Sequence, residues 1–270
     1  MDKPRYLPDP DRLSVLAATI ILAYTLTRFI EFPERNLSLQ LPGIYIAFNL
    51  NIYTIVTVLV AGLTAAGTTW LLGDHPGLIG KITLQHWILP ALTAWIIGIP
   101  LNQINFSLTW WFVLAVGGVL LTLILVAEYI VIDPDDIRQP LAAAGLTAVA
   151  FALLLVLAIT LRYAGVRLYL FLPALTIGSG LVCLRAMYLR LHGRWTVIQA
   201  GIASLITGQI AAALYYWPVS PITYGLCLLG PAYALSSLLS NLMEEKPLRQ
   251  AILEPALALL IVWVTAWLTK

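Results

Sequence analysis

Nine long apolar segments follow one another along this 270-residue chain, with short polar joints between them. A helix that crosses the hydrocarbon core of a bilayer needs about 20 mostly apolar residues, and each segment reaches or approaches that length. The pattern therefore predicts nine membrane-spanning helices. They cover residues 12–31, 54–72, 86–103, 108–131, 140–163, 167–190, 195–216, 221–241 and 250–268.

The stretch from Leu37 to Tyr53 fits this pattern poorly. Three interpretations are open: it prolongs the second helix, it lies in the membrane interface, or it dips into the bilayer and returns. The remaining joints are short and rich in turn residues. No segment is long enough for a separate soluble domain, so we expect a single transmembrane domain over residues 1–270.

The composition supports a membrane protein. Hydrophobic residues make up 60% of the chain and charged residues only 10%, whereas a soluble domain carries about 25% charged residues. The sequence therefore predicts an all-α integral membrane protein whose main partner is the lipid bilayer. A net charge of +2 gives no indication of nucleic-acid binding, and a homo-oligomer or a membrane-complex partner stays open.

The loops carry an uneven share of Lys and Arg. Nine predicted helices place ten of these residues on the side of the N-terminus and five on the other side. Positive residues gather on the cytoplasmic side of membrane proteins. We therefore expect a multi-pass protein of the bacterial cytoplasmic (inner) membrane with its N-terminus in the cytoplasm.

Two pentapeptides recur in the same register. AGLTA occurs at 61–65 and 144–148, LPALT occurs at 89–93 and 172–176, and both pairs are 83 residues apart. Two matches at one offset predict a repeat of three helices. The expected repeat units are 12–103, 108–190 and 195–268.

An odd number of helices in each unit makes successive units enter the membrane from opposite sides. Inverted repeats of this kind occur in secondary transporters, where paired broken helices form the substrate site. The candidate helix breaks are Pro90, Pro100, Pro173, Gly178 and Gly180. The alternative is a duplication kept for packing, with Pro and Gly as ordinary kinks.

Three ionisable residues within the predicted helices stand out: Glu128, Arg185 and Glu254. A charge at the centre of a bilayer costs about 2.5–3.5 kcal/mol on insertion scales, so such residues are candidates for an ion pair, a proton relay or a gate. Asn102 corresponds to Arg185 in the repeat, so Asn102, Gln103 and Arg185 could line equivalent halves of one cavity. The alternative is that each charged side chain reaches the nearby headgroups.

The sequence offers little for catalysis or for a cofactor. The EEKPLR element at 244–249 resembles part of an intramembrane metalloprotease motif, but no histidine follows His192. The IGSG element around Ser179 lacks the first glycine of the rhomboid motif and a helical histidine to act as its base. His75 and His192 lie in predicted loops, and His86 lies alone near a helix start. We expect no catalytic residues, no metal site and no cofactor.

The elements YLPDPDR, EYIVIDPDDIR, LPALT and GPAYAL together resemble an uncharacterised family of bacterial, Chloroflexi-type polytopic membrane proteins. That resemblance implies a membrane location and no activity. The repeat and the charged residues favour a small-solute or ion transporter-like protein, with a pathway between the third and sixth helices. The alternative is a non-catalytic membrane subunit or scaffold, with a solid interior and an apolar surface toward a partner.

Overall fold

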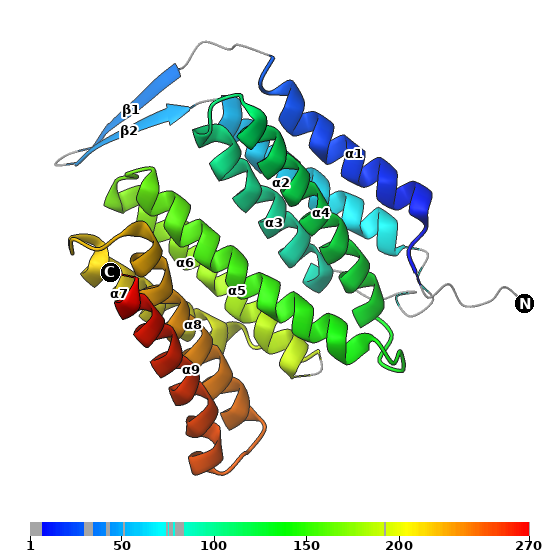
Figure 1. The fold of residues 1–270 in the computed structure, drawn as a ribbon, viewed down its shortest axis with the longest axis vertical. Helices are drawn as coiled ribbons and strands as arrows, with labels where there is room; N and C mark the ends of the chain where they lie inside the picture. Colours follow the sequence, from blue (N-terminus) through cyan, green and yellow to red (C-terminus); the bar gives the residue numbers. More distant parts are fainter. Residues whose placement is uncertain are drawn as a thin grey trace, which may run out of the picture. The chain divides into compact units, whose positions relative to one another are not determined.

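The computed structural model describes residues 7–29, 35–41, 44–50, 52–73, 75, 78, 84–191 and 193–269, and for 35–41, 44–50 and 52–54 it describes the backbone. This part of the chain contains nine helices and one hairpin (Figure 1). The helices are α1 (Pro10–Leu26), α2 (Ile52–Leu72), α3 (Leu84–Gln103), α4 (Leu108–Val131), α5 (Gln139–Tyr163), α6 (Leu168–Arg190), α7 (Val197–Tyr215), α8 (Pro221–Met243) and α9 (Leu248–Leu268).

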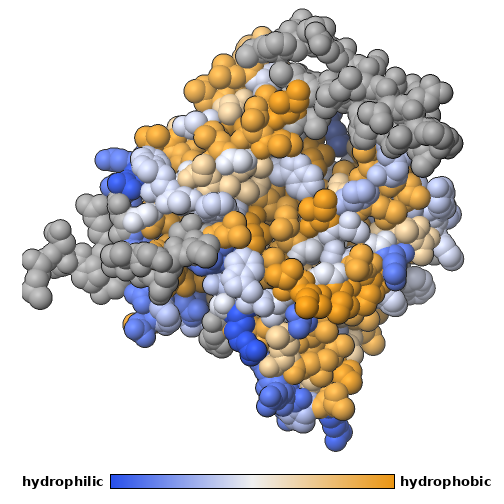
Figure 2. Space-filling model, turned by 180° about the vertical axis from the view of Figure 1, so that it is seen from behind, coloured by the Kyte–Doolittle hydropathy of each residue, from blue (hydrophilic) through white to orange (hydrophobic). Residues whose placement is uncertain are grey.

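The prediction of an all-α membrane protein with about nine helices is confirmed. Eight helices, α2 to α9, are long and apolar enough to cross a membrane. The remaining helix, α1, has 17 residues, which is the lower end of the usual range of about 17–25 for a span. Figure 2 shows apolar residues over much of the visible face, as lipid contact requires.

The stretch that fitted poorly forms two antiparallel strands, β1 (Arg35–Leu41) and β2 (Ile44–Leu50). In the register of the pair, Arg35 lies opposite Leu50 and Leu41 lies opposite Ile44. The residues 36–41 read Asn-Leu-Ser-Leu-Gln-Leu, and this strict alternation is typical of a strand. None of the three interpretations of this stretch included a hairpin.

The chain divides into two compact units, a first unit (Met1–Ile132) and a second unit (Asp133–Lys270). In the first unit, α1 packs on α2, α2 on α3, α3 on α4, and α4 on α1, so four helices close a bundle. Its core contains Leu16, Ile20, Tyr24, Leu114 and Leu121. The three repeat units expected from the sequence have other boundaries and stay a prediction.

The second unit repeats this closed arrangement. Helices α5, α6, α7 and α8 pack in the same cyclic order, and α9 packs on α8. Only three residues of α9 are buried, namely Ala251, Pro255 and Ala266. The other side chains of α9 include many exposed apolar ones, which suit contact with lipid.

An arginine fastens the first helix of each unit to its third. Arg28, just after α1, donates to the carbonyl oxygens of Leu101 (3.0 Å) and Ile104 at the end of α3. Its guanidinium lies 5.8 Å from the ring centre of Trp110, in the first turn of α4. Cations favour such helix ends because the last carbonyl groups lack partners within the helix.

Arg162, near the end of α5, makes the corresponding contacts in the second unit. It donates to the carbonyl oxygens of Tyr215 (2.5 Å) and Trp217 (3.0 Å) at the end of α7. Its guanidinium lies 5.1 Å from the ring centre of Tyr224, in the first turn of α8. In both bundles, therefore, an arginine at the end of the first helix binds carbonyl oxygens at the end of the third helix.

Candidate functional site

The second unit contains a cavity of about 530 Å³ between α5, α6 and α8. This volume falls in the usual range of about 300–1,000 Å³ for sites that bind small molecules. The lining residues are Ala143, Ala144, Thr147, Ala148, Phe151, Ala186, Met187, Leu189, Arg190, Tyr233, Ser236, Ser237 and Ser240.

The cavity exists because one face of α5 carries small side chains. Ala144 and Ala148 are one helical turn apart, and Ala143 and Thr147 form a second such pair beside them. Close-packed protein interiors normally leave few voids larger than a water molecule. Leucine at these positions would fill the space that alanine leaves open.

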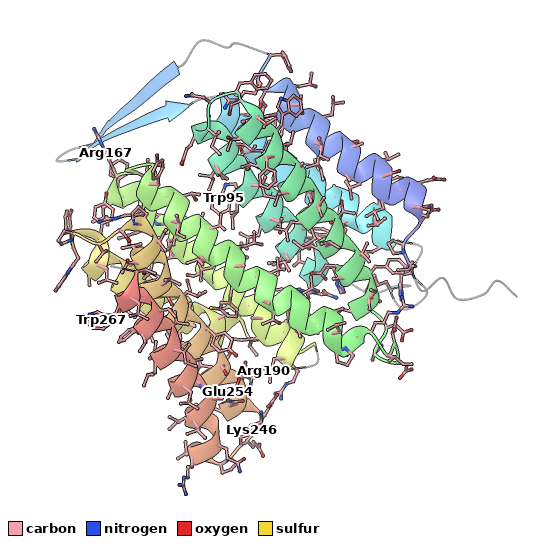
Figure 3. The ribbon with its side chains drawn as sticks, in the orientation of Figure 1. Trp95, Arg167, Arg190, Lys246, Glu254 and Trp267 are labelled. Atoms are coloured by element: carbon pink, nitrogen blue, oxygen red, sulfur yellow. The ribbon has the colours of Figure 1, made fainter. Side chains whose placement is uncertain are left out.

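Arg190 is the one charged residue of the lining, and it is the last residue of α6. Its Nη1 donates to Ser237 Oγ at 2.8 Å, and its Nη2 donates to Asn241 Oδ1 at 3.0 Å. Nη2 also forms an ion pair with Glu254 Oε2 of α9 at 2.9 Å. In Figure 3, Arg190 and Glu254 point toward each other, with Lys246 close by.

Asn241 connects the three helices of this cluster, and a proline explains why. Pro255 has no backbone N–H, so the carbonyl of Ala251 one turn earlier in α9 lacks its usual donor. The Nδ2 of the buried Asn241 donates to that carbonyl at 3.2 Å. Its Oδ1 accepts from Arg190 and from Lys246 Nζ, the latter at 3.0 Å. One amide thus positions Arg190 and attaches α9 to α8.

Two aromatic rings line the cavity next to this cluster. Phe151 of α5 and Tyr233 of α8 meet edge to face, with ring centres 5.2 Å apart. The hydroxyl of Tyr233 donates to Glu254 Oε1 at 3.4 Å, and Ser237 Oγ donates to the same oxygen. Glu254 therefore accepts from three residues of this cluster without lining the cavity itself.

The predicted candidates of the second unit have different surroundings. The side chain of Glu254 is 50% exposed and belongs to the Arg190 cluster. Arg185 is fully buried within α6, with its guanidinium 5.4 Å from the ring centre of Tyr188. Neither Glu254 nor Arg185 lines the cavity.

Glu128 lies in the first unit and has a partner that the sequence did not indicate. It is fully buried near the end of α4, and its Oε2 lies 2.8 Å from Nδ1 of His86 in the first turn of α3. His86 is buried as well. The expectation that Glu128 reaches the headgroups on its own does not describe this buried pair. His75, in a predicted loop, is also buried, against the ring of Tyr129.

Asn102 and Gln103 lie at the C-terminal end of α3, where both are exposed. Asn102 lines a small hollow of about 10 Å³ beside Arg28 and Gly98. This hollow is too small for anything but a water molecule. The role of both residues in a solute pathway stays a prediction.

The predicted helix breaks all lie inside continuous helices. α3 passes through Pro90 and Pro100, and α6 passes through Pro173, Gly178 and Gly180. Each proline removes one backbone donor, so these positions are weak points of their helices. Their expected place in a substrate site stays a prediction.

No group of three or more His, Cys, Asp or Glu side chains with metal-binding geometry occurs in the described ranges. His192 lies outside those ranges. Cys183 and Cys227 are free thiols.

The sequence contains a pattern that indicates the serine side of the cavity, although no local motif marks it. Ser236, Ser237, Ser240 and Asn241 follow the spacing i, i+1, i+4 and i+5, which places them on one face of a helix. A polar face on an apolar span indicates a cavity or an interhelical contact. Arg190 was counted only as a loop charge.

The model of one protein family, described as "Protein of unknown function (DUF5656)", matches residues 32–269. The chain belongs to this family. The prediction of an uncharacterised family is therefore confirmed, and membership covers all helices of the second unit and α2 to α4 of the first. No curated protein and no solved structure matches the chain.

Proposed function

We propose that this member of the DUF5656 family is a transporter-like membrane protein that binds a small solute in the cavity of the second unit. The observation that carries the proposal is the cavity itself, with a charged and hydroxyl-bearing wall inside a bundle of membrane helices. Ionisable groups are costly at membrane depth, and those that occur there face cavities and partners.

The alternative function, a scaffold packed against partner proteins, predicts a solid interior. The second unit has a hollow of about 530 Å³ that opens to the outside at the exposed Ala144 and Ala148, and this hollow favours solute binding. The apolar surface of α9 suits lipid as well as a partner, and it therefore supports neither function over the other.

The proposal includes a location and an orientation. Because the chain has the hydropathy of a multi-pass protein and ten of its Lys and Arg residues on one predicted side, we place it in the bacterial inner membrane with the N-terminus in the cytoplasm. The cavity then opens near the cytoplasmic surface, because Arg190 ends α6 on that side.

Purified protein in liposomes tests this function. Labelled sugars, amino acids, short carboxylates and alkyl phosphates serve as probes. We expect uptake of at least one class by the wild-type protein and loss of that uptake in Ala148→Leu, which fills the cavity. Glu254→Gln should reduce uptake, because it removes the charge that holds Arg190. Uptake no greater than that of empty liposomes for every class would contradict the proposal.

A further inference from the structure

The lining of the cavity indicates what kind of ligand it holds. Alanines, Met187 and Phe151 supply most of the wall, and Arg190 supplies its one charge. A hydrophilic ion or a sugar would press its polar groups against these apolar side chains, which is unfavourable without hydrogen-bond partners. A ligand with an apolar chain would bury that chain against them.

Polarity changes along the length of the cavity. At one end, Arg190 is the last residue of α6 and Ser240 lies three residues before the end of α8. Tyr233 lies one turn before Ser237 in α8; its hydroxyl donates to Glu254, and its ring contacts Phe151 of α5. The wall of α5 between Ala143 and Phe151 is about 12 Å long at 1.5 Å per residue. The charge is therefore at the C-terminal end of α6, and Phe151 lies about two helical turns from Ala143 along α5.

Arg190 has donors left for a ligand. A guanidinium has five N–H groups, and three of them serve Ser237, Asn241 and Glu254. Within the described part of the chain, Nε and one N–H of Nη1 are not used. Carboxylates and phosphates match the geometry of such donors better than other groups do.

Glu254 fixes Arg190 from outside the cavity. Its carboxylate belongs to α9 and does not line the hollow, so a ligand meets the guanidinium and the hydroxyl groups rather than the acid. The hydroxyl groups of Ser236 and Ser240 donate to backbone carbonyls one turn earlier in α8, and both residues line the cavity beside Arg190.

From these observations we infer that the cavity binds an anionic amphiphile, a single alkyl chain with a carboxylate or phosphate head. The head accepts hydrogen bonds from Arg190, and the chain follows the alanine face of α5 toward Phe151. The inference rests on the proposed function of this cavity and names its ligand class.

The chain offers a matched pair of variants. Both Ala148 and Ala152 are exposed, but only Ala148 lines the hollow. Ala148→Leu therefore puts three additional carbon atoms into the hollow, whereas Ala152→Leu makes the same change one turn further along α5, outside it. Arg190→Gln removes the charge. If Arg190→Gln does not fold, the alanine pair still tests the inference.

Binding of radiolabelled decyl phosphate to the full chain in phosphatidylcholine nanodiscs is the test, with empty nanodiscs as background. We expect Ala148→Leu to weaken binding about tenfold or more and Ala152→Leu to leave it unchanged. Unlabelled decyl phosphate or decanoate should compete, and the stronger competitor identifies the head. Decanol and decyltrimethylammonium should compete at least about tenfold less well, because a charge-assisted hydrogen bond contributes about 1.5–3 kcal/mol.

The inference is overturned if decyl phosphate does not bind above the background of empty nanodiscs, or if Ala148→Leu and Ala152→Leu weaken its binding equally. It is also overturned if decanol competes as well as the anions, or if folded Arg190→Gln keeps the preference for an anionic head. Binding without uptake in liposomes contradicts transport and keeps the ligand class. Uptake of a sugar or an amino acid that Ala148→Leu blocks keeps transport and overturns the ligand class.

Discussion

At the scale of single residues, the side chain of Asn241 connects α9, Arg190 and Lys246 through hydrogen bonds. It supplies a donor to a carbonyl that Pro255 leaves without one, and it accepts from two cations. A buried amide with all these partners is expensive to remove, because each partner then loses a hydrogen bond in a site that water reaches poorly.

We predict that Asn241→Ala lowers the free energy of unfolding by about 1–3 kcal/mol, measured by thermal or denaturant unfolding in detergent. Leu242→Ala, at the exposed neighbouring position of the same helix, is the control, and it should change stability little. In a Pro255→Ala background, α9 regains its own backbone donor, so the cost of Asn241→Ala should be smaller. An equal cost in both backgrounds would contradict the role assigned to Asn241.

The buried pair of the first unit gives a second prediction. His86→Ala leaves the carboxylate of Glu128 buried with one partner fewer, and breaking a buried pair from one side typically costs about 3–5 kcal/mol. We expect a marked fall in the unfolding temperature of the purified protein. His86→Ala combined with Glu128→Gln should recover part of that loss, and no recovery would indicate that the two side chains act independently.

The sequence identified the acids of both clusters but not their partners. Glu128 and Glu254 are conspicuous because carboxylates are rare in apolar spans. His86 is 42 residues from Glu128, and Arg190 is 64 residues from Glu254. No helical spacing connects residues so far apart, so these pairs depend on how the helices pack.

At the scale of helices, α2 and α3 approach closely at Gly98, which has no side chain to keep them apart. A Cβ atom on Gly98 would lie 2.5 Å from Cγ2 of Thr57, whereas Gly62 of α2 has open space in that direction. We predict that Gly98→Ala destabilises the protein by about 1–3 kcal/mol through overpacking. Gly62→Ala should be neutral or slightly stabilising because alanine favours a helix. Unfolding in detergent compares the two, and equal effects would contradict a close contact at Gly98.

Helix positions were predictable from the sequence because long apolar runs and short polar joints both follow from a bilayer solvent. The segment at 108–131 coincides with α4 at both ends. The hairpin of β1 and β2 was missed because seven-residue strands are shorter than a span, and a search for spans overlooks their alternation. The cavity was missed because alanines on α5 indicate a hollow only once α8 is known to pack beside them.

At the scale of the whole molecule, alternating spans fix on which side each loop lies. Three helices separate the loop at Ile137 from the loop at Tyr216, so the two loops should lie on opposite sides of the membrane. We predict that, in a Cys183→Ala and Cys227→Ala background, Tyr216→Cys reacts with an impermeant maleimide from outside intact cells. Ile137→Cys should react only after permeabilisation. Labelling of both from one side would contradict the span count, and the reverse pattern would invert the orientation.

The contacts of Arg28 and Arg162 at the helix ends bear on whether each unit can fold as a separate polypeptide. Because Arg28 and Arg162 each fasten a first helix to a third helix of the same unit, neither bundle needs the other to complete its ring. The boundary between the two units lies between Ile132 and Asp133, so each ring of helices is formed from one continuous stretch of the chain. Cutting the gene at that point and producing both halves together should still yield two folded bundles in one membrane.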